Sequence, residues 1–178
     1  MHTTRTSLPD ITKMSGSLDK TNESDNSKHQ VGEDFVDVVE GKLSIENITS
    51  RATSPSAGAI GLFVGTTRNH FEGKEVLRLE YEAYMPMAKK KMLETCQLVR
   101  SQWNVENIVM VHRIGEVPVM EASIIIAISA SHRKEALEAV HFAIDSVKAT
   151  VPIWKKEVYN DATSSWKENR ECTWISKD

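Results

Sequence analysis

The sequence has few cysteines and no long apolar segment, and both absences narrow what the protein can be. Its 178 residues include two cysteines, Cys96 and Cys172, too few for a disulfide framework or a cysteine metal cluster. We therefore expect a reducing, cytosolic environment. The longest apolar run, Ile124–Ile128, has the length of a strand, whereas a membrane-spanning helix needs about 20 apolar residues. The sequence therefore predicts no membrane span.

Charge and motif content exclude further classes of protein. The chain has 22 Lys and Arg against 25 Asp and Glu, and its net charge of −3 gives no general attraction to nucleic acid or anionic membranes. It has no phosphate-binding P-loop, no GxGxxG dinucleotide motif and no HExxH or CxxC metal motif. His70, His112 and His141 do not have the spacing of metal ligands. We therefore expect neither a cofactor nor a metal.

The composition changes near residue 33. Residues 1–33 contain ten Ser or Thr, no aromatic residue and charges of both signs, so they have too little apolar surface to offset the entropy of ordering. They also lack the apolar core of a secretory signal and the Arg-rich, acid-poor composition of a mitochondrial presequence. We predict that they form a disordered polar tail, which one domain follows.

Hydrophobic periodicity predicts both strands and helices in that domain. In residues 77–84, Leu77, Leu79 and Tyr81 alternate with charged residues, as in a half-buried strand. Residues 123–129 are apolar throughout, which is typical of a strand buried on both faces. The predicted strands are residues 35–39, 59–64, 77–84, 108–114, 123–129 and 153–158, and the predicted helices are residues 44–53, 86–103 and 132–148. This mixed order favours an α+β fold.

Basic residues open the last predicted helix. The first N–H groups of a helix lack internal partners and carry partial positive charge, so His132 and Arg133 at this end could bind a phosphate or carboxylate. An equally simple interpretation is a helix capped by Ser131 whose basic residues face solvent. The spacing alone does not decide between these two interpretations.

Two further lysines lie at the end of this helix and just beyond it. Lys148 borders the apolar stripe of the helix, and strand alternation after Pro152 puts Lys155 and Lys156 on opposite faces. A helix end, a proline turn and a strand start could bring the ammonium groups of Lys148 and Lys155 together. Close like charges lower each other's pKa, which favours nucleophilic or proton-transferring lysines. Alternatively, Lys148 pairs with Asp145 and the lysines are surface residues on a turn.

Taken together, the stretches around these residues resemble one family, the large catalytic subunits of molybdopterin synthase. They occur in the order that the family has and extend over residues 34–170, which leaves residues 171–178 as a C-terminal tail. The segments that carry the resemblance are Gly65-Thr66-Thr67-Arg68-Asn69, Leu79-Glu80-Tyr81-Glu82-Ala83-Tyr84, His112-Arg113-Ile114-Gly115, Ser131-His132-Arg133, and Lys148 with Pro152-Ile153-Trp154-Lys155-Lys156-Glu157.

The resemblance implies a fold, a reaction and partners. The fold is an α/β-hammerhead, a mixed sheet with two main helices packed on it. The implied activity is that of a cytoplasmic sulfurtransferase in molybdenum cofactor biosynthesis, active only with its small subunit. Sulfur passes from the thiocarboxylated Gly-Gly C-terminus of this ubiquitin-like subunit to cyclic pyranopterin monophosphate and makes the dithiolene of molybdopterin. Two large subunits form the central dimer of a heterotetramer, and no cofactor is implied.

The resemblance also implies site residues. Lys148 and Lys155 are the expected catalytic residues. The expected substrate-binding residues are His132, Arg133, Lys148, Lys155, Lys156, Glu157 and Arg68. Strand alternation favours Lys155 over Lys156 as the lysine that faces substrate, and a dimer would let His132 and Arg133 serve the neighbouring pocket. The sequence departs from the family at Thr66, where many bacterial members carry a lysine, and at Ser131, which is commonly alanine. An alternative function is a non-catalytic module that binds a ubiquitin-like tail or a phosphorylated metabolite.

Overall fold

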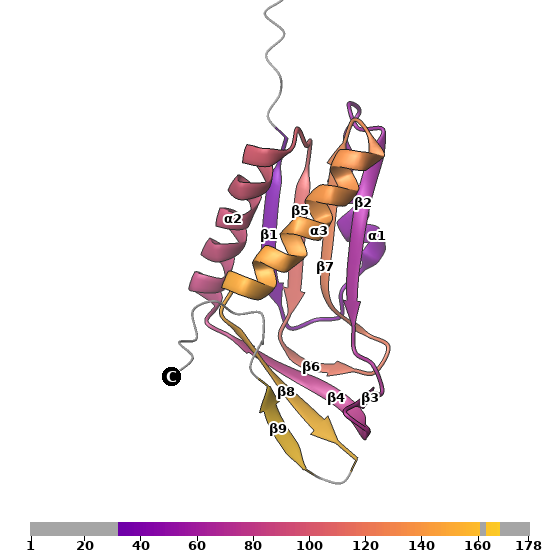
Figure 1. Cartoon of the computed structure of the whole chain (residues 1–178), viewed down its shortest axis with the longest axis vertical. Helices are drawn as coiled ribbons and strands as arrows, with labels where there is room; N and C mark the ends of the chain where they lie inside the picture. Colours follow the sequence, from indigo (N-terminus) through magenta and orange to yellow (C-terminus); the bar gives the residue numbers. More distant parts are fainter. Residues whose placement is uncertain (1–31, 161–162, 168–178) are drawn as a thin grey trace, which may run out of the picture. The chain divides into compact units, whose positions relative to one another are not determined.

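A four-stranded main sheet in the order β1-β5-β7-β2 forms the centre of the fold (Figure 1). The structure is a computed structural model and describes residues 32–160 and 163–167. Of the predicted tails, 1–33 and 171–178, residues 1–31 and 171–178 lie outside the described residues. The bounds of the strands are Asp34–Val39 for β1, Ile108–Arg113 for β5, Ala122–Ala130 for β7 and Ala59–Thr66 for β2. β1 pairs with β5 in parallel, and the other neighbours are antiparallel.

Helices cover both faces of the main sheet. α2 (Met85–Gln102) and α3 (Arg133–Thr150) cover one face, and the short α1 (Ile45–Ala52) covers the other (Figure 1). The central strand β7 is therefore buried on both sides, as predicted, because Ile126 and Ile128 pack toward α2 and α3 whereas Ile125 and Ala127 pack toward α1. No helix within the described ranges combines the length and the apolar character needed to cross a bilayer.

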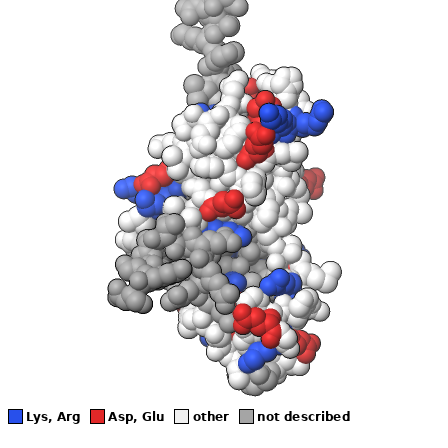
Figure 2. Space-filling view, in the orientation of Figure 1, with Lys and Arg blue, Asp and Glu red and all other residues white. Residues whose placement is uncertain are grey.

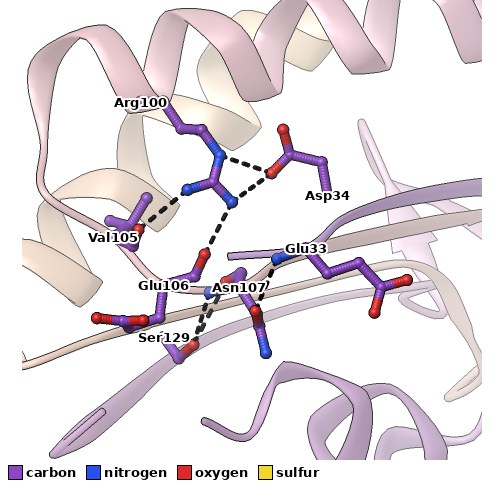
Figure 3. Close-up of polar contacts among 7 residues, drawn as sticks. All are labelled: Glu33, Asp34, Arg100, Val105, Glu106, Asn107 and Ser129. Atoms are coloured by element: carbon purple, nitrogen blue, oxygen red, sulfur yellow. Dashed lines mark hydrogen bonds and ion pairs between the residues drawn. The ribbon is translucent and has the colours of Figure 1, made fainter. Parts of the chain in front are cut away.

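Arg100 fastens the C-terminal end of α2 to the main sheet (Figure 3). Its guanidinium donates to the Asp34 carboxylate at 2.8 and 2.6 Å, which joins the helix to β1. The same side chain donates to the backbone carbonyls of Val105 and Glu106 at 3.0 and 2.8 Å, just before β5. One planar group thus fixes the helix end to two neighbouring strands, because guanidinium has several donors in a fixed geometry.

A second sheet adjoins one end of the main sheet, next to the C-terminal end of α3 (Figure 1). It contains β3 (His70–Phe71), β4 (Lys74–Ala83), β8 (Ile153–Tyr159) and β9 (Ser164–Lys167) in this order, and β6 (Gly115–Pro118) also pairs with β4. The predicted α+β class, with a mixed sheet and two main helices, is therefore confirmed. The three short strands β3, β6 and β9 were not predicted, because two to four residues are too short to show a hydrophobic period.

Two details of the sequence prediction were wrong. Leu77 does not share a face with Leu79, because the register of β4 shifts between Val76 and Arg78; Val76 is 3 % exposed and Leu77 is 45 % exposed. A bulge of this kind inserts one residue and reverses the alternation on one side of it. Ser131 is not the N-cap of α3 either. The cap is His132, and the Ser131 hydroxyl instead donates to the carbonyl of Ser56 at 3.5 Å.

Close packing between α3 and β2 predicts the effect of a substitution. A Cβ at Gly61 would lie 2.5 Å from the Ala136 carbonyl oxygen of α3, so Gly61→Ala must push the helix away from the sheet. We expect a loss of about 2 kcal/mol in the free energy of unfolding, the usual cost of overpacking. Gly41→Ala is the matched control, since a Cβ at Gly41 has no atom within 4 Å. Chemical denaturation measures both, and equal stability of the two variants would contradict this packing.

Candidate active site

A cavity of about 580 Å³ lies where the main sheet, the C-terminal half of α3 and the second sheet meet. Its walls include apolar side chains from β2, β4 and α3, among them Phe63, Leu79, Ile144 and Val147. Cavities of several hundred cubic ångströms with apolar walls and a few polar groups are typical of sites for small molecules. The shape therefore suits a ring-containing ligand.

Three basic side chains from three separate segments line this cavity. Lys148 comes from the last turn of α3, Lys155 from β8, and Arg68 from the chain that follows β2. The two lysines share the cavity because only Val151 and Pro152 separate the end of α3 from the start of β8. The Val151 N–H still donates to the Val147 carbonyl at 3.0 Å, and Pro152 then ends the helix. The cavity thus suits an anionic ligand.

An aromatic ring and a carboxylate orient these cations. The Arg68 guanidinium carbon lies 5.3 Å, and the Lys155 ammonium nitrogen 6.0 Å, from the centroid of the Phe71 ring. Lys155 Nζ also lies 3.3 Å from Glu157, a residue that is 2 % exposed and whose carboxylate accepts a hydrogen bond from the Tyr159 hydroxyl at 2.6 Å. Glu157 is therefore fixed in place and in turn positions Lys155.

His112 and Tyr81 form the inner part of the cavity. Their rings meet edge to face with centroids 5.1 Å apart. Burial lowers the pKa of His112 to about 4, so its ring is neutral at physiological pH. Burial also raises the pKa of Tyr81, with a further contribution from the negative charge of Glu157, although a hydrogen bond with Ser123 opposes both. From the sequence, His112 lies in a segment that carries the family resemblance and lacks the spacing of a metal ligand; its place in an apolar strand is the signal that indicates a buried ring.

Lys156 lies on the other face of β8. Its ammonium nitrogen is 3.3 Å from the Glu80 carboxylate and 5.9 Å from the Trp166 ring, and it is not among the residues that line the cavity. Hydrogen bonds from Arg78 and then from Lys156 lower the pKa of Glu80. Of the two neighbouring lysines, the structure thus brings Lys155 to the cavity.

His132 and Arg133 lie at the opposite end of α3 from Lys148. The helix has 18 residues, so its two ends are about 27 Å apart. Both residues are exposed, and neither lines the cavity of its own chain. Basic side chains are visible where α3 begins, with acidic side chains directly beside them (Figures 1 and 2). The structure therefore does not bring His132 and Arg133 together with the two lysines of the same chain.

Metal ligands are not gathered in this part of the molecule. Among residues 32–160 and 163–167, no three His, Cys, Asp or Glu side chains lie where they could hold a metal ion. Thr66, at the position where many bacterial members carry a lysine, lines the cavity.

Comparison with known proteins shows the family. The family described as MoaE protein matches residues 38–150. A protein of Bos taurus named molybdopterin synthase catalytic subunit is 51 % identical over 153 residues, which is 86 % of this chain and 81 % of that protein. The Homo sapiens protein of the same name is 54 % identical over 143 residues, 80 % of this chain and 76 % of its own.

Solved structures agree with these matches. Molybdopterin synthase from Staphylococcus aureus superposes with a TM-score of 0.70 and 35 % identity over 74 % of this chain and 95 % of its own. A complex of subunits 1 and 2 of molybdopterin-converting factor from Helicobacter pylori shares the fold, with a TM-score of 0.64 and 21 % identity over 77 % of this chain and 92 % of its own. The chain belongs to the MoaE family. The predicted activity, that of a transferase in molybdenum cofactor biosynthesis, is confirmed.

The buried histidine makes the stability of this protein depend on pH. The pKa of His112 is about 4 in the folded chain against 6.5 in an exposed ring, so between these values the unfolded chain binds one more proton. The contribution of the neutral His112 ring to the free energy of unfolding is therefore fully present above pH 6.5. It falls as pH drops toward 4, by roughly 3 kcal/mol in total. Denaturation from pH 8 to pH 4 should show this extra slope in the wild type relative to His112→Phe. Parallel curves for the two proteins would refute the neutral buried ring.

Proposed function

We propose that the cavity is where sulfur passes from the thiocarboxylated C-terminus of a small ubiquitin-like subunit to cyclic pyranopterin monophosphate. The observation that carries this proposal is the meeting of Lys148, Lys155 and Arg68 in one cavity of about 580 Å³. Both reactants are anions, and the acceptor is a ring compound of a size that such a cavity can hold. Cations in a partly desolvated cavity bind such anions more strongly than cations on an open surface.

The sulfur does not come from the chain's own cysteine in the described ranges. Cys96 is fully buried in the core, and burial raises the pKa of its thiol to about 12. A protonated, inaccessible thiol neither attacks a substrate nor accepts sulfur from a donor. This supports a partner that brings sulfur in activated form, as a thiocarboxylate does.

Each basic residue then has a separate task. Lys148 stabilises the charge that develops on the donor's terminal carbonyl group. Alternatively, once the sulfur has bonded to the pterin, the neutral amine of Lys148 attacks that carbonyl; the bond between carbonyl carbon and sulfur breaks, the sulfur stays on the pterin, and water hydrolyses the acyl link to the partner's carboxylate. Lys155, held by the buried Glu157 at 3.3 Å, orients the reacting carbon or moves protons. Arg68 contributes to binding the phosphate, since guanidinium matches the geometry of phosphate oxygens. Lys156 takes no part, because it is paired with Glu80 on the other face of β8.

The arrangement of α3 supports a dimer of this chain as the working unit. His132 and Arg133 are expected to bind the phosphate, yet they lie about 27 Å from the end of α3 that carries Lys148. A second copy of the chain would supply them to the neighbouring cavity. The H. pylori neighbour is a complex of two different subunits. We therefore propose a cytosolic heterotetramer with two copies of this chain at its centre.

Removing either lysine amine tests the catalytic roles. With thiocarboxylated partner and precursor supplied, Lys148→Ala and Lys155→Ala should each lower kcat by about a hundredfold or more, because each removes a charge that acts in the transition state. Lys156→Ala should stay within about threefold of the wild type, because that lysine faces away from the cavity. Molybdopterin is measured by the fluorescence of its oxidised product. Normal turnover of both cavity variants, with normal assembly, would favour a non-catalytic binding module.

Mixing two inactive variants tests the exchange of residues between copies. Arg133→Ala and Lys148→Ala should each be inactive alone. After subunit exchange in equal amounts, half of the dimers are mixed, and one of their two sites is intact, so roughly a quarter of wild-type activity should return. Lys148→Ala mixed with Lys155→Ala is the control, because both defects fall in the same cavity and nothing is restored. Absence of recovery in the first mixture would show that each chain uses its own Arg133.

A further inference from the structure

The rim and the interior of the cavity differ in their charged and polar groups. Arg68 and Lys148 at the rim are exposed, whereas His112 and Glu157 are 7 % and 2 % exposed. The two exposed cations thus lie toward solvent, whereas His112 and Glu157, which can accept hydrogen bonds, lie in the buried part of the cavity. A ligand that satisfies both regions has an anionic end and, at its other end, groups that donate hydrogen bonds.

The tautomer of His112 follows from its neighbours. Nδ1 lies 2.7 Å from the backbone carbonyl oxygen of Arg113, which can only accept, so Nδ1 carries the proton. The ring is neutral, which leaves Nε2 as a bare acceptor. Among residues 32–160 and 163–167, the hydrogen bond of the His112 ring is the one through Nδ1, and the ring lines the cavity. The edge-to-face contact with Tyr81, at an interplanar angle of 73°, holds the ring in this orientation.

The second acceptor in the interior, Glu157, already has partners within the protein. The Glu157 carboxylate accepts from the Tyr159 hydroxyl at 2.6 Å and lies 3.3 Å from Lys155 Nζ. His112 Nε2 is therefore an acceptor in the cavity wall that can receive a hydrogen bond from a ligand. The cyclic phosphate and the ionised thiocarboxylate carry neither N–H nor O–H at neutral pH, so neither can donate to it. The N–H groups of a pterin ring can.

We propose that His112 accepts a hydrogen bond from an N–H group of the pterin and so fixes which end of the substrate lies inside the cavity. This inference rests on the proposed function and adds to it a residue that selects orientation. With the ring edge held by His112, the phosphate points toward the cationic rim. The reversed pose would place a phosphate against Nε2 and Glu157, where two acceptors and a charge repel it. His112 therefore contributes to substrate affinity and positions the reacting carbon near Lys155.

Three substitutions distinguish a role of His112 as a hydrogen-bond acceptor from a role in packing. His112→Gln has an amide oxygen that can reach the place of Nε2, His112→Asn keeps a donor near the place of Nδ1, and His112→Phe keeps the ring against Tyr81. In the complex with the small subunit, Asn and Phe should raise KM for the precursor about tenfold or more, as expected for one lost hydrogen bond in a buried site. Gln should stay within about threefold. A merely structural role would lower the activity of all three alike and lower their thermal stability.

A measurement on the wild-type chain detects the hydrogen bond directly. In the complex labelled with ¹⁵N-histidine, the Nε2 resonance of His112 should move on addition of precursor, in the direction of a newly accepted hydrogen bond. Addition of inorganic phosphate alone should leave it in place. The resonance is assigned by its loss in His112→Gln.

The outcomes also distinguish this inference from the proposed function. If the wild type makes molybdopterin and Lys155→Ala does not, but the His112 variants keep the wild-type KM and the resonance does not move, the role of His112 alone is refuted. If the resonance responds to the partner's C-terminal tail and not to the precursor, a peptide N–H is the donor and the inference is wrong. If the wild-type complex transfers no sulfur, the proposed function fails and the assignment of the pterin fails with it.

Discussion

The two-residue connection between α3 and β8 is the constraint on which the site depends. α3 is held on the main sheet by a continuous apolar stripe, and Val151, 3 % exposed, belongs to the same core. Pro152 cannot continue the helix, and the Ile153 N–H donates to the Val151 carbonyl at 2.9 Å, so the chain turns at once into the second sheet. Lys148 and Lys155 therefore have to border the same space. The meeting of these two lysines in one site therefore depends on that short turn.

Neighbouring side chains stabilise the positive charge of the cavity without neutralising it. Phe71 offers a π face to Arg68 and Lys155, which stabilises cations without neutralising them as a carboxylate does. Among the described residues that line the cavity, Glu157 has the one buried carboxylate. It accepts a hydrogen bond from Tyr159 and is oriented toward Lys155. Lys156 is kept apart by Glu80. Neighbouring lysines on one strand thus have different roles because alternate residues of a strand face opposite sides.

Several of these features could be predicted from the sequence because they depend on local patterns. The apolar run within β7, the stripe of α2 and the spacing of Lys148 and Lys155 around Pro152 are local signals. The bulge in β4 and the short strand β6 could not be predicted, because they form against partners that are distant in the chain, and the two residues of β3 are too few to show a hydrophobic period. His112 was missed for a related reason. Its function depends on a carbonyl, an aromatic ring and a cavity, and the sequence around it shows only an apolar strand.

A crystal structure of this chain with its small subunit and cyclic pyranopterin monophosphate would test the central claim most directly. The claim is that the cavity between α3 and the second sheet binds the anionic reactants through Lys148 and Lys155 together. We expect pterin density inside this cavity, with the partner's C-terminal carboxylate within hydrogen-bonding distance of at least one of the two ammonium groups. A pterin bound elsewhere on the chain, with neither lysine in contact with a reactant, would contradict it.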